Sequence, residues 1–176
     1  MPGDDAELGL ASQVQPDAIG VPGQRRFRLL VEAQGGSACL WLEKDQLLQL
    51  GIAVKRLMAQ LPPRNPAPRE GASPPPVGSR SPGSSLEIRT SSLSLGHDRA
   101  RNLFMLAAEG VEMDGDVATG LRFWVDRRLL DTMADEAIRV CAAGRPQCPL
   151  CGVPMNPGEP HLCLRRNGHN KSAEFE

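Results

Sequence analysis

The stretch RRFRLLVEAQGGSACLWLEKDQLLQLGIAVKRLMAQL, residues 25–61, predicts two strands and a helix in direct succession. Residues 25–33 have the apolar density of a half-buried strand, a Gly-Gly turn follows, and residues 38–43 form the returning strand. Apolar residues then recur every three or four positions, as one face of an amphipathic helix requires, until Pro62 ends the pattern. This unit sets the fold class.

A second unit of the same kind follows in the chain. It is predicted to contain three strands and a helix, at residues 86–96, 102–110, 121–126 and 127–144. The halves resemble each other, since each has a strand with a central Trp41 or Trp124 before a helix that opens on Leu-Leu. One unit cannot bury both its sheet face and its helix stripe alone. We therefore expect an α+β fold, with an antiparallel sheet built from two strand–strand–helix units, both helices on one face, and a C-terminal zinc knuckle.

Composition divides the chain into five segments. We expect a flexible N-terminal tail at residues 1–23, the first ββα unit at 24–61, a Pro-rich disordered linker at 62–85, the second βββα unit at 86–144, and a zinc knuckle with its tail at 145–176. The linker has no pattern that would bury one face. We interpret it as a tolerated surface insertion, because the entropy of loop closure grows slowly with loop length.

Charge and hydropathy exclude several classes of protein. The 176 residues carry a net charge of −1, without the excess of Lys and Arg that marks a polyanionic partner. The opening MPGDDAELGLAS lacks the basic and apolar regions of a signal peptide, and no apolar stretch reaches the ~18 residues of a spanning helix. We expect a cytoplasmic protein with no membrane span. In that compartment clustered cysteines favour metal ligation over disulfides.

The stretch GRPQCPLCGVPMNPGEPHLCLRRNGH, residues 144–169, holds three of the five cysteines and two of the three histidines. Cys148 and Cys151 have the C-x2-C spacing of a zinc knuckle, and His161 and Cys163 form a second ligand pair after a Pro- and Gly-rich return. Three sulfurs and one imidazole make a tetrahedral structural zinc set. We predict one structural Zn²⁺ per chain, whose loss lowers thermal stability. His169 remains an alternative to His161 as the fourth ligand.

Other chemistries fit these cysteines less well. A disulfide leaves His161 unexplained, and a redox C-x-x-C pair opens a helix, which Gly152 and Pro154 oppose. A catalytic zinc needs an open coordination position, whereas four protein ligands fill the shell. We interpret Cys39 and Cys141 as core thiols.

The residues after the knuckle are the candidate partner-binding group: Arg165, Arg166, Asn167 and His169. We predict that they bind a protein partner of unknown identity. A nucleic acid is the less favoured partner, because no aromatic residue for base stacking lies between Cys148 and Lys171.

We find no nucleotide-binding, hydrolase or metalloprotease motif and assign no catalytic residue. The sequence favours a zinc-stabilised binding or adaptor protein over a nucleic-acid-binding protein, and over an enzyme with an unrecognised site. A pocket that gathered His97 with Asp98 or Asp114 would favour the enzyme.

The segments VPGQRRFRLLVEA, WLEKDQL, SLSLGHD and AAGRPQCPLCGVPMNP…HLCLRRNGH resemble the DUF3090 family of uncharacterised bacterial proteins. The resemblance runs from about Val21 to His169, without the linker. It implies a zinc-ribbon-like motif whose metal ligands are Cys148, Cys151, His161 and Cys163. Leu164 departs from the pattern, since the family often has Pro there. The resemblance implies no activity, because the family is one of unknown function.

Overall fold

The computed structural model describes residues 5–63, 67–78, 83–115, 117–144, 148–153, 155, 161 and 163. Its elements follow the order β1 (Ala6–Ile19), β2 (Arg26–Ala33), β3 (Gly36–Leu42), α1 (Lys44–Gln60), β4 (Ser85–Asp98), β5 (Leu103–Glu112), β6 (Ala118–Val125) and α2 (Arg127–Ala142). The chain is therefore a βββα unit followed by a second βββα unit. Neither helix in the described part of the chain is long and apolar enough to cross a membrane.

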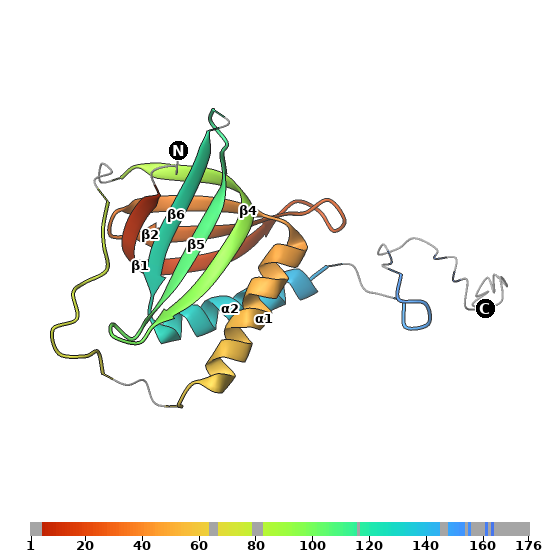
Figure 1. The fold of residues 1–176 in the computed structure, drawn as a ribbon. Helices are drawn as coiled ribbons and strands as arrows, with labels where there is room; N and C mark the ends of the chain where they lie inside the picture. The colour runs from red at the N-terminus through yellow and green to blue at the C-terminus, as the bar shows by residue number, and fades with distance from the viewer. Residues whose placement is uncertain are drawn as a thin grey trace.

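The six strands form a closed barrel in the order β1-β2-β3-β4-β5-β6. Neighbours within each half pair antiparallel, whereas the two pairings between the halves, β3 with β4 and β1 with β6, are parallel. Both helices lie across the same end of the barrel (Figure 1). The α+β class and the two strand-and-helix units are confirmed, and closure of the sheet gives each of the six strands a neighbour on both sides over at least part of its length.

The first of these strands corrects one prediction. Residues 1–23 are not a flexible tail throughout, because β1 occupies 14 of them and pairs with both β2 and β6. Its register shifts between Glu7 and Leu10 and again between Ala11 and Gln13. These irregularities interrupt the period-two alternation by which a half-buried strand is recognised in a sequence.

The core fills the barrel and extends into the helices. Alternating strand residues point inward, and the most deeply buried include Leu8, Leu29, Val31, Leu40, Ile88, Phe104, Leu106, Leu121, Phe123 and Val125. The helices close the end of the barrel with the apolar stripes Leu47, Leu50 and Val54 of α1 and Leu130, Met133, Ala137 and Cys141 of α2. Fully burying a Leu or Val side chain contributes about 1.5–3 kcal/mol, so these stripes hold both helices on the barrel.

The Pro-rich linker is also more ordered than the sequence predicts. Its described part, residues 67–78, runs along the outside of the barrel (Figure 1). The Arg69 N–H donates to the Ala100 carbonyl at 2.9 Å, and the Gly78 N–H donates to the Glu7 carbonyl at 2.7 Å. The expectation of disorder is therefore wrong for this part. Since β3 and β4 are parallel, the chain needs a crossover, and the linker is the return leg from α1 to the start of β4.

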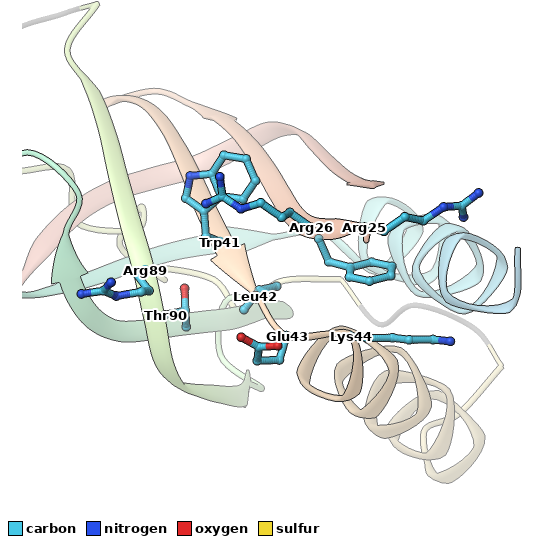
Figure 2. Close-up of a pocket in the computed structure, with 9 residues that line it drawn as sticks. Arg25, Arg26, Trp41, Leu42, Glu43, Lys44, Arg89 and Thr90 are labelled. Atoms are coloured by element: carbon cyan, nitrogen blue, oxygen red, sulfur yellow. The ribbon is translucent and has the colours of Figure 1, made fainter. Parts of the chain in front are cut away.

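A pocket of about 200 Å³ opens where β3 ends and the chain turns into α1 (Figure 2). β3 and β4 stay paired up to Trp41 and Arg89, after which β4 continues without β3. The residues that line the pocket belong to β2, β3, β4 and the start of α1, together with the residue before β2, and include Arg25, Arg26, Trp41, Lys44, Arg89 and Thr90. The pocket therefore exists because β3 is shorter than its neighbour.

Candidate metal centre

The candidate metal centre begins with a tight turn after α2. The Cys148 N–H donates to the Val153 carbonyl at 2.9 Å, and the Gly152 N–H donates to the Cys148 carbonyl at 2.8 Å. Gly152 has φ of +74°, a left-handed conformation that favours glycine. The turn therefore brings the Cys148 and Cys151 thiols together.

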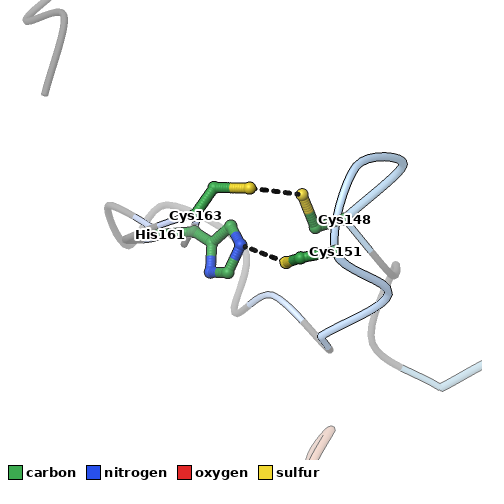
Figure 3. Close-up of side chains that lie close together, drawn as sticks. All are labelled: Cys148, Cys151, His161 and Cys163. Atoms are coloured by element: carbon green, nitrogen blue, oxygen red, sulfur yellow. Dashed lines mark hydrogen bonds between the residues drawn. The ribbon is translucent and has the colours of Figure 1, made fainter. Parts of the chain in front are cut away.

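The second ligand pair lies against this turn (Figure 3). The Cys148 and Cys163 sulfurs are 3.8 Å apart, and Cys151 Sγ lies 3.1 Å from His161 Nε2. One ligand atom from each of the four residues lies within 4.8 Å of all the others. They are close enough to bind one metal ion.

The spacing fits a tetrahedral ion. Zinc–sulfur bonds of ~2.3 Å at tetrahedral angles place two sulfurs roughly 3.8 Å apart, and the Cys148–Cys163 separation is 3.8 Å. A sulfur and an imidazole nitrogen would lie roughly 3.6 Å apart in such a site. The 3.1 Å between Cys151 and His161 is shorter, so these two side chains would separate slightly to admit the ion.

The turn also favours a charged sulfur at one position. Hydrogen bonds from the backbone N–H groups of Cys151 and Leu150 lower the pKa of the Cys148 thiol to about 6. The pKa of Cys151 is raised, because the lowering effect of the Val153 N–H is outweighed by desolvation and by the neighbouring cysteines. A bound divalent cation would favour the thiolate at both positions.

The other cysteines lie apart from this cluster, and all five are free thiols. Cys141 is a core thiol as predicted, 2 % exposed, with its Sγ donating to the Lys44 carbonyl. Cys39 is only half-buried and lies outside the core, because the strand alternation directs its neighbours Ala38 and Leu40 inward. Burial raises the pKa of both thiols.

The residues named for the enzyme hypothesis do not come together. The His97 ring stacks on Phe104, with 4.6 Å between ring centroids. Asp98 accepts hydrogen bonds within the β4–β5 turn. Asp114 follows the far end of β5 and lines a different pocket from that of Figure 2.

The candidate partner-binding residues Arg165, Arg166, Asn167 and His169 lie outside the described residues. His169 as a replacement for His161 therefore stays a prediction.

Sequence reasoning missed the basic pocket beside β3. Its lining residues come from positions far apart in the chain, such as Arg26, Lys44 and Thr90, so no short sequence motif contains them. One signal was present: Thr90 continues the inward alternation of Leu86 and Ile88, where a hydroxyl is unusual in an apolar core.

The fold and the cluster define an α+β barrel protein with a candidate Cys₃His metal centre at its C-terminal side. The chain belongs to the family described as "Protein of unknown function (DUF3090)", whose model matches residues 8–163. That match covers all six strands in whole or part, both helices and the four clustered residues. No curated protein and no solved structure matches the chain.

Proposed function

We propose that the protein is a zinc-stabilised binding or adaptor protein of the cytoplasm, with Zn²⁺ held by Cys148, Cys151, His161 and Cys163. The observation that carries this proposal is the convergence of the four ligand atoms within 4.8 Å. Thiolate and imidazole ligands in a tetrahedral set favour zinc over magnesium or calcium, which take oxygen ligands. Four protein ligands complete the shell, which supports a structural role.

The metal itself is tested by elemental analysis of the purified chain. We expect about one zinc per chain in the wild type, as in other closed structural sites, and loss of the metal in the double variant Cys148→Ser plus Cys151→Ser. Cys39→Ser is the matched control, because it removes a thiol outside the cluster and should retain the metal. A wild type that is folded and free of metal would contradict the proposal.

The effect on stability should be local. Among the described residues, the hydrophobic core cluster includes none of the four candidate ligands. We therefore expect the double variant to retain the circular dichroism of the barrel while proteolysis of the segment after α2 accelerates. Equal protection of that segment with and without metal would contradict a structural role for zinc.

The adaptor role rests on the basic residues that follow the cluster in the sequence. We expect the zinc-loaded wild type to retain a protein partner in a pull-down, and the double variant Arg165→Ala plus Arg166→Ala to lose it while keeping its zinc. Loss of the partner together with the zinc would not separate the two roles, so metal content is measured on the same samples. Retention of the partner by the zinc-loaded double variant would contradict the role of these arginines.

A further inference from the structure

The second half of β4 has a neighbouring strand on one side only. β3 pairs with β4 up to Trp41 opposite Arg89, whereas β5 pairs with β4 as far as Asp98. Among the described residues, no strand and no backbone hydrogen bond meets residues 92–98 on the side away from β5. In an antiparallel pair, alternate residues direct their N–H and C=O groups away from the partner strand. This edge therefore presents backbone donors and acceptors that β5 does not use.

A groove of about 340 Å³ runs along this edge, between β4 and α1 (Figure 1). Five consecutive residues of β4, 91–95, line it. Side chains of a strand alternate between its two faces, so a groove on either face would be lined by every second residue. Five lining residues in a row place the groove along the backbone edge of β4.

The other wall of the groove is one face of α1. Residues three and four positions apart align on a helix, and the lining residues of α1 have this spacing: Gln46, Gln49, Leu50 and Ala53. The Gln46 side chain is held at both of its ends, because its Oε1 accepts from the Glu43 N–H at 2.9 Å and its Nε2 donates to the Ser91 carbonyl at 3.2 Å. This second hydrogen bond ties α1 to β4 and closes one end of the groove.

The walls of the groove carry no charge. Only glutamine, serine, leucine and alanine residues line it. Leu50 belongs to the core, and Leu93 and Leu95 are partly buried against it, so an apolar side chain in the groove would contact leucine. Natural edge strands are often protected from pairing by charged residues or proline, and residues 91–95 include neither.

The first strand of the other half provides an internal contrast. β1 also continues beyond its last pair with β6, which joins Leu10 to Trp124, and runs on to Ile19. There α2 packs against β1 more extensively than α1 packs against β4. The helix of one half thus covers the first strand of the other in one case, and leaves a groove beside it in the second case.

We propose that this groove binds an extended peptide segment of a partner protein, which adds to β4 as a further strand. The backbone of residues 92–98 exchanges hydrogen bonds with the segment, and every second side chain of the segment lies against Leu50, Leu93 and Leu95. Strands pair at a spacing of about 4.8 Å, so one segment fills the space beside β4. A second copy of the chain fits less well, because its own α1 stands beside the same edge.

This surface goes beyond the adaptor role proposed above. It uses neither the metal cluster nor the arginines that follow the cluster in the sequence. The two proposals can therefore fail independently of each other.

The test begins with random peptides of about ten residues, the length of a long strand, displayed on phage and selected on the full zinc-loaded chain. We expect the enriched peptides to have apolar residues at alternate positions, as the two faces of a strand require. Enrichment of no peptide, or of peptides with a helical spacing of apolar residues, overturns the proposal.

A pair of variants locates the binding site of the enriched peptides. Ala53→Trp fills the groove from an exposed position of α1, and Ala59→Trp adds the same side chain at an exposed position of α1 outside the groove. We expect peptide affinity, measured by fluorescence anisotropy, to fall about tenfold or more in Ala53→Trp and to stay unchanged in Ala59→Trp. Both variants should keep the circular dichroism of the wild type. Equal affinity of the wild type and Ala53→Trp overturns the proposal.

N-methylation of the peptide tests whether it binds as a strand. Each methyl group removes one backbone donor, and an added strand directs only every second N–H toward β4. Affinity should therefore fall about five- to tenfold at alternate residues, with little change between them. Loss without this alternation, or no loss at any residue, overturns the proposal.

Sedimentation velocity of the wild type decides between a partner segment and a second copy. A monomer leaves the edge of β4 available, as the proposal requires. A dimer that dissociates in Ala53→Trp and persists in Ala59→Trp assigns the edge to a second copy of the chain and overturns the proposal.

Discussion

Asp98 organises the turn between β4 and β5. Its Oδ1 accepts hydrogen bonds from the backbone N–H groups of Ala100 at 2.8 Å and Arg101 at 3.1 Å, and its Oδ2 accepts from the Arg101 guanidinium at 2.5 Å. The Arg101 backbone N–H, followed by its side chain, holds the pKa of Asp98 below its ordinary value. Asn102 then adopts φ of +54°, which completes the reversal.

Replacing Asp98 with asparagine should weaken the turn measurably. Hydrogen bonds to a charged group contribute about 1.5–3 kcal/mol, so we expect Asp98→Asn to lower the free energy of unfolding by about 1–3 kcal/mol at pH 7, measured by urea denaturation. Because the folded pKa is lowered, this stabilisation is present above the unfolded pKa of about 3.9 and is lost as the pH falls through the folded value.

The pH dependence supplies the control for Asp98. The difference between wild type and Asp98→Asn should shrink below about pH 4, where the carboxyl of the unfolded state becomes protonated, and should vanish once the pH has fallen through the lower pKa of the folded state. Asp114→Asn, at an exposed carboxylate in another turn, should change the stability by less than about 0.5 kcal/mol. A difference for Asp98→Asn that stays constant to the lowest pH would contradict the charge-based explanation.

At the scale of elements, Arg101 also joins this turn to the crossover linker. Its Nε donates to the Ser73 carbonyl at 2.8 Å, beside the hydrogen bond from Arg69 to Ala100. We expect Arg101→Ala to loosen residues 67–78 and to accelerate proteolysis at the exposed Glu70 about five- to tenfold, since one hydrogen bond of about 1 kcal/mol is lost from local opening. Cleavage is followed by mass spectrometry under native conditions.

The matched control for the linker is Arg99→Ala, at an exposed arginine in the same turn. It should leave cleavage at Glu70 unchanged while the circular dichroism of both variants stays native. Equal acceleration in the two variants would mean that the turn, and not the hydrogen bond to Ser73, protects the linker.

The elements differ in how well the sequence predicted them, for a physical reason. β2, β3 and both helices have regular apolar periods, which local sequence contains in full. β1 exists as a strand because β2 and β6 pair with it, and β6 lies more than 100 residues away at the partners Ala6 and Leu121. The stability of a strand depends on such non-local partners, so the residues of β1 alone do not predict that it is a strand.

The same reasoning applies to the metal cluster and to the pocket at the end of β3. The four clustered metal-binding candidates lie within 16 residues of chain, so spacing alone brought them together in the prediction. The basic pocket depends on the register between β3 and β4, where Trp41 lies opposite Arg89. A pairing between residues nearly 50 positions apart is not contained in any local pattern.

At the scale of the whole molecule, the two βββα units are joined through both their strands and their helices. β3 pairs with β4 and β1 with β6 in parallel, α1 contacts α2, and α2 also packs against β1. Lys55 of α1 forms ion pairs with Asp131 at 2.7 Å and Asp135 at 2.6 Å of α2. Both halves also contribute to one core cluster. Neither half therefore has a core of its own, and we expect the barrel to unfold in one transition.

Gly51 of α1 lies in the contact with α2, and a substitution there tests how tightly the two helices pack. A Cβ at this position would lie 3.0 Å from Ile138 Cγ1 and 3.2 Å from the Ala134 carbonyl oxygen. A glycine inside a helix costs about 1 kcal/mol relative to alanine, so close packing of the helices explains its presence. Gly51→Val should push the helices apart and lower the free energy of unfolding by about 1–3 kcal/mol.

Single-tryptophan variants show whether this loss reaches both halves. Trp124→Phe leaves Trp41 to report on the first half, and Trp41→Phe leaves Trp124 to report on the second. In each background Gly51→Val should lower the urea midpoint by the same amount, because the shared core unfolds as one unit. Ala53→Val, which adds the same branched side chain at an exposed position of α1, corrects for helix propensity and should have a smaller effect. Midpoints that separate between the two tryptophans would show that the halves unfold independently and would contradict a single cooperative barrel.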